Sequence, residues 1–106
     1  MVRIAVEFEA GETRRIEVDG HAGQNDPGED IVCAGVSALV ETLKLGLEQV
    51  VPDGAWFDVQ AGHAEFRLPA GADPRQRAVV DTILTGLRDL AGSYSQFVTF
   101  QAGSRR

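Results

Sequence analysis

The chain has 106 residues, of which 43% are hydrophobic and 25% charged, a composition that suits one domain with its own buried core. The formal net charge of −6 argues against direct binding of nucleic acid, because phosphate recognition requires a basic surface. No apolar run approaches the roughly 18 residues that cross a bilayer, and the N-terminus alternates apolar with polar residues, unlike a signal peptide. We therefore expect a single cytoplasmic domain over residues 1–106, without membrane contact.

The first half of the chain predicts a β-hairpin followed by a helix. Apolar and polar residues alternate over 2–8, the period of a half-buried strand, and strand character resumes over 13–18. From Glu29 or Asp30 to the segment before Pro52, apolar residues recur at intervals of three and four, as on one face of a helix. Asp30 is the candidate N-cap of this helix.

The second half repeats the pattern and adds a last strand. A second hairpin is predicted over 56–60 and 64–68, and a final strand over 97–101. Between them a helix is predicted to begin with Asp73 as its cap and Pro74 at its first position, and to close at Gly92. Because two amphipathic helices each need a sheet face to cover, the fold class is α+β. We expect a two-layer sandwich of a mixed or antiparallel sheet and two helices, in the order strand-strand-helix-strand-strand-helix-strand.

The single cysteine, Cys33, excludes an intrachain disulfide and is a candidate nucleophile. A helix that starts near Asp30 puts Cys33 in its first turn. There the unpaired amides and the macrodipole favour the thiolate and can also hold an oxyanion. The alternative is that Cys33 is a small hydrophobic side chain packed at a helix start.

A histidine lies at the mouth of the glycine-rich loop that leads into this helix. The loop runs over residues 19–28, and His21 stands near its beginning. We expect the loop to stay mobile and to be able to bring His21 to Cys33. A Cys–His pair is the minimum set for nucleophilic acyl chemistry, with the histidine as general base.

The segment from Asp19 to Leu39 reads DGHAGQNDPGEDIVCAGVSAL, and it closely resembles the ribosomal-processing cysteine protease family, called Prp. Members carry a GHA tripeptide, a short variable loop with glycine and a helix start similar to GEDIVCAAVSAL. The match includes the histidine, the cysteine and the spacing of twelve residues between them. Weaker similarity extends over nearly the whole chain.

The resemblance implies a homodimeric endopeptidase that removes an N-terminal extension from a bacterial large-subunit ribosomal protein, with no cofactor. By position in the motif, His21 would be the base and Cys33 the nucleophile. Asp30 would support the site, and Ser37 would pack behind the thiol or hydrogen-bond near it. The substrate loop would include Ala22, Gly23 and Gly28.

Two other functions remain open at this point. A redox or metal-sensing thiol protein would keep a reactive Cys33 without needing His21, whereas a non-catalytic module associated with ribosome assembly would keep Cys33 inert. We expect no metal site, because a zinc ion held by His21, Cys33 and His63 would lack a fourth ligand and the usual ligand spacing.

Overall fold

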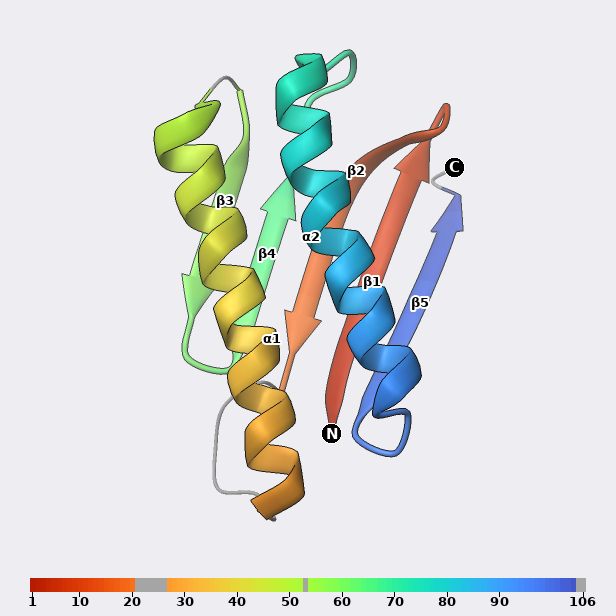
Figure 1. The fold of residues 1–106 in the computed structure, drawn as a ribbon. Coiled ribbons are helices and arrows are strands. Elements are labelled where there is room, and N and C mark those ends of the chain that lie inside the picture. The colour runs from red at the N-terminus through yellow and green to blue at the C-terminus, as the bar shows by residue number, and fades with distance from the viewer. Residues whose placement is uncertain (21–26, 53, 105–106) are drawn as a thin grey trace.

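The predicted order of elements is confirmed in the computed structural model, which describes residues 1–20, 27–52 and 54–104 (Figure 1). The first half contains strands β1 (Val2–Glu9) and β2 (Glu12–Asp19), helix α1 (Pro27–Leu45) and its π-helical continuation η1 (Gly46–Val50). The second half contains strands β3 (Trp56–Gln60) and β4 (His63–Arg67), helix α2 (Pro74–Ser93) and strand β5 (Val98–Ser104).

The five strands form one mixed sheet in the order β3-β4-β2-β1-β5. Strands β1 and β5 pair in parallel, and the other neighbouring pairs are antiparallel. Both helices lie on the same face of the sheet, so the molecule has two layers (Figure 1). The predicted α+β sandwich is therefore confirmed.

The core lies between the helices and the covered face of the sheet. Alternate residues of β1 are buried in it (Val2, Ile4 and Val6), as are Ile16 and Val18 at the end of β2. Phe66 of β4 is fully buried at its centre, against Phe57 of β3. The helices contribute apolar residues spaced by three or four, namely Val32, Val36, Val40, Leu43 and Leu47 on one side and Val80, Ile83, Leu84 and Leu87 on the other.

The predicted start of α1, at Glu29 or Asp30, was wrong by two or three residues. The helix begins at Pro27, whose fixed φ suits the first helical position, so Asp30 is an exposed residue inside the helix and not its N-cap. Cys33 becomes the seventh residue of α1 and lies in its second turn. The free amides at the helix start are therefore a turn away from Cys33, and our first-turn argument for a thiolate and an oxyanion site does not hold.

The start of α2 agrees with the prediction. The side chain of Asp73 accepts a hydrogen bond of 2.7 Å from the backbone N–H of Arg75, and Pro74 follows as the first helical residue. At the other end α2 continues one residue past Gly92, to Ser93. Neither α1 nor α2 is apolar enough over its described length to span a membrane.

Candidate active site

Cys33 lies where α1 passes the end of β2. Its thiol makes a weak hydrogen bond to the backbone carbonyl of Gly20, with 3.9 Å between Sγ and the oxygen. Only 6% of Cys33 is exposed, and its side chain belongs to the hydrophobic core cluster. The side chain is thus largely shielded from solvent.

Gly20 is held in a position that only glycine can take without strain. Its φ is +88°, and a Cβ built on it would overlap the carbonyl oxygen of Met1. The Gly20 N–H donates a 2.8 Å hydrogen bond to the carbonyl of Gly62, in the turn between β3 and β4. Three segments therefore meet beside the thiol: the start of β1, the end of β2 and the β3–β4 turn.

The described surroundings of Cys33 favour the neutral thiol. Burial is the largest cause that raises the pKa of Cys33, and the carboxylates of Glu29 and Asp30 raise it further. The N-terminal ammonium group opposes this effect, and it forms an ion pair with Glu29. At neutral pH a base is therefore needed to make this sulfur nucleophilic.

The other predicted site residues fall in three places. Ser37 lies one turn after Cys33 on the same side of α1 and is half-buried. Asp30 is exposed, and Gly28 is the second residue of α1, so it belongs to the helix and not to the preceding loop. His21, Ala22 and Gly23 lie outside the described residues.

A hollow of about 280 Å³ lies between α1 and the edge strand β3, and its lining on the helix begins at Ser37, one turn after Cys33. Gly62, which accepts the hydrogen bond from Gly20, lines one end of it, and Ser37 lies on the helix side. The remaining lining residues are Val40, Glu41, Val59, Gln60 and Ala61. The hollow did not follow from the sequence, because β3 and α1 are brought together only by the sheet order.

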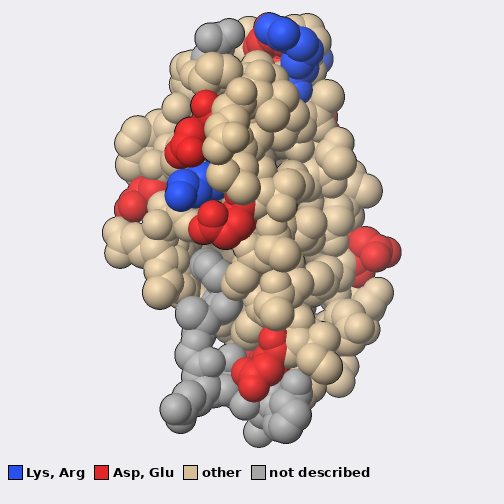
Figure 2. All heavy atoms as spheres, turned by 60° about the vertical axis from the view of Figure 1, so that its left-hand side comes forward, with Lys and Arg blue, Asp and Glu red and all other residues tan. Residues whose placement is uncertain are grey.

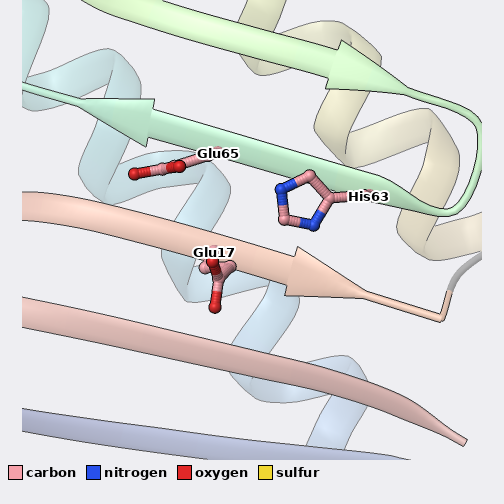
Figure 3. Close-up of side chains that lie close together, drawn as sticks. All are labelled: Glu17, His63 and Glu65. Atoms are coloured by element: carbon pink, nitrogen blue, oxygen red, sulfur yellow. The ribbon is translucent and has the colours of Figure 1, made fainter.

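A second group of titratable side chains lies on the uncovered face of the sheet. Glu17 of β2 and His63 and Glu65 of β4 offer ligand atoms within 4.8 Å of one another (Figure 3). Arg15, however, donates hydrogen bonds to both glutamates, at 2.7 and 2.8 Å, and Asp19 is 2.5 Å from Nδ1 of His63. These contacts form an ion-pair network, and a metal would have to displace Arg15 from it.

The Asp19–His63 pair predicts a small loss of stability as the pH rises. The hydrogen bond to Asp19 raises the pKa of His63 above its ordinary value of 6.5. A raised folded-state pKa contributes stability that is complete below the unfolded pKa and is lost as the pH rises through the folded one. We expect the melting temperature to fall by a few degrees between pH 6 and pH 9, and His63→Gln to reduce that fall, measured by thermal unfolding. An identical fall in both proteins would contradict it.

Comparison with known proteins identifies the family to which this chain belongs. The family described as cysteine protease Prp matches residues 1–99. The ribosomal processing cysteine protease Prp of Staphylococcus aureus is 29% identical over 89 residues, which cover 81% of this chain and 83% of that protein. Its Bacillus subtilis counterpart is 30% identical over 77 residues, covering 67% of this chain and 65% of that one.

Solved structures share the fold. A crystal structure of a Streptococcus mutans protein has a TM-score of 0.88 at 26% identity and covers 99% of this chain and 96% of that one. Staphylococcus aureus Prp in complex with a substrate peptide has a TM-score of 0.87 at 20% identity, covering 96% and 99% of the two chains. The protein is a cysteine protease. The chain belongs to the Prp family of ribosomal processing cysteine proteases.

Proposed function

We propose that this protein is an endopeptidase that removes the N-terminal extension of a bacterial large-subunit ribosomal protein, with Cys33 as nucleophile and His21 as general base. The observation that carries the proposal is the contact between the Cys33 thiol and the carbonyl of Gly20. His21 follows Gly20 directly in the chain, so the imidazole is attached one residue from a group that touches the sulfur. The relatives named for ribosomal processing supply the substrate class.

A Cys–His dyad can act either as a preformed thiolate–imidazolium ion pair or as a neutral thiol with a general base, and the raised pKa of Cys33 favours the second form. Burial and the nearby carboxylates raise the pKa of the Cys33 thiol, which favours a mechanism in which His21 takes the thiol proton as a general base during attack. His21 takes the thiol proton as Sγ bonds to the scissile carbonyl carbon. The proton then passes to the leaving amine as the C–N bond breaks, which leaves a thioester on Cys33.

Hydrolysis of the thioester completes the cycle. His21 accepts a proton from water as the water oxygen attacks the acyl carbon, and that proton returns to Cys33 as the C–S bond breaks. The products are two peptides, and both residues regain their starting protonation states. No redox step or additional reactant is needed.

Alkylation of Cys33 at different pH values tests the role of His21 without any substrate. With iodoacetamide, we expect the rate to rise with pH in every variant, because the thiolate is the reactive form. The His21→Ala variant should alkylate at least about tenfold more slowly than wild type at pH 7, since it loses the base. Mass spectrometry of the intact protein measures the rate.

His63→Ala is the matched control, because His63 also follows a glycine and precedes an alanine but lies on the uncovered face of the sheet. Its rate should equal that of wild type. Equal rates in wild type and His21→Ala would remove His21 from the dyad. They would favour the inert-thiol alternative if both are slow, and a redox thiol if both are fast.

A further inference from the structure

The hollow between α1 and β3, which begins one turn after Cys33, is lined by both apolar and acidic side chains. Its apolar lining includes Val40 of α1, which is buried, and Val59 of β3, which is half-buried, whereas Glu41 of α1 is exposed. Among the described residues, Glu41 takes part in none of the ion pairs and none of the side-chain hydrogen bonds. A ligand can therefore compete for this carboxylate without breaking an existing contact.

Charge near the hollow favours a basic ligand. The same helix carries Glu29 and Asp30 before Cys33 and Glu48 after Glu41, with Lys44 as its one basic side chain between residues 27 and 50. Figure 2 turns this side of the molecule forward and shows more acidic than basic groups on it. The net charge of −6 acts in the same direction.

We propose that this hollow is a specificity site for a lysine or arginine of the substrate peptide, an inference that rests on the proposed protease function. A long basic side chain has two parts that match the two parts of the site. Its methylene stem packs on Val40 and Val59, and its cationic head reaches Glu41. The volume of about 280 Å³ is below that of most small-molecule pockets and suits a single side chain.

The helix geometry sets how far this basic residue lies from the scissile bond. Glu41 is eight residues after Cys33, which is about 12 Å along the axis at 1.5 Å per residue. An extended peptide advances about 3.3 Å per residue, so 12 Å corresponds to three or four residues. Because the basic side chain itself bridges part of that distance, we expect it two to four positions from the cleaved bond.

Peptide kinetics test the site directly. The parent peptide spans the cleavable N-terminal extension of a bacterial large-subunit ribosomal protein. A series of variants carries a single lysine at each position in turn, within six residues of the cleaved bond. With wild-type protein, we expect a lysine two to four positions away, on one side of the bond, to raise kcat/KM about 2- to 5-fold over alanine, as for an exposed charge pair. The Glu41→Lys variant should lose this preference and should favour a glutamate there.

Glu48→Lys is the matched control, because it makes the same charge change on an exposed residue seven positions further along. It should keep the wild-type preference. Cleavage by wild type with no dependence on the lysine, or an equal dependence in Glu41→Lys, overturns this inference and leaves the protease function standing. Failure of wild type to cleave any peptide overturns the proposed function, and this inference with it.

Discussion

Replacement of Cys33 by Ala should reduce kcat/KM for the ribosomal peptide by at least about 10³-fold, which is roughly 4 kcal/mol of transition-state stabilisation. The variant keeps His21 and the peptide-binding surface but has no atom that can form the thioester. Its fold should persist, because alanine fills most of the space of a buried cysteine, and stability should fall by only about 1 kcal/mol. Steady-state cleavage assays and thermal unfolding measure the two effects.

Two further variants make the Cys33 prediction specific. Cys33→Ser should be as inactive as the alanine variant, because a serine hydroxyl has a much higher pKa than a thiol. Thr42→Ala, an exposed change on the same helix, should retain wild-type kinetics. Cleavage by Cys33→Ala at more than a tenth of the wild-type rate would mean that another residue attacks the peptide.

Gly20→Ala should both destabilise the protein and remove activity. The alanine would carry a φ of +88° and would place its Cβ against the Met1 carbonyl, so the end of β2 must move. We expect a loss of about 2 kcal/mol or more, a fall of roughly 10 °C in melting temperature. Because the Gly20 carbonyl touches the Cys33 thiol and His21 comes next, kcat/KM should fall at least tenfold even below the melting transition.

Gly11→Ala separates backbone strain from damage to the site. Gly11 also has a positive φ, +78°, but a Cβ there meets nothing within 4 Å. The variant should lose about 1 kcal/mol through strain alone and should keep its activity. If Gly20→Ala matched Gly11→Ala in both stability and cleavage, the close approach of Gly20 to Met1 would have no consequence for the site.

Local patterns were sufficient to predict the fold. Short segments carry these patterns: apolar residues alternate with polar ones in β1, strand character returns in β2, and α2 has an apolar face that follows its Asp73 cap. Tertiary packing in this protein agrees with these local preferences. The parallel pairing of β1 with β5 is different, because it joins the two ends of the chain and leaves no local signal. The sequence therefore predicted only a mixed or antiparallel sheet.

The start of α1 was mispredicted because two helix signals compete within four residues. Asp30 is a good N-cap residue and Gly28 is a poor helix former, so a late start was favoured. Pro27 at the first position was the stronger signal, since its φ is already helical and its missing N–H would be unpaired there. The error matters for chemistry, because it moved Cys33 from the first turn into the second.

Cys33 as the nucleophile stays a prediction from the sequence, and its environment could not be predicted at all. Burial of Cys33 against the end of β2, and the carboxylate of Glu29 beside it, depend on how α1 lies on the sheet. Glu41, which we propose to hold a basic side chain, carried a signal that the sequence analysis did not use: it follows Cys33 by eight residues, about two turns along the helix and roughly 80° around its axis. The other wall of the hollow, from Val59 to Gly62, becomes visible only in three dimensions.

Mass spectrometry of one cleavage reaction tests the central claim most directly. A peptide spanning the extended N-terminus of a bacterial large-subunit ribosomal protein is incubated with wild-type protein, Cys33→Ala and His21→Ala. We predict a single cut by wild type, at the end of the extension, and no cut at that bond by either variant over the same time. An uncut peptide with folded wild-type protein, or the same cut by both variants, would contradict the proposal that Cys33 and His21 form a ribosomal-protein-processing dyad.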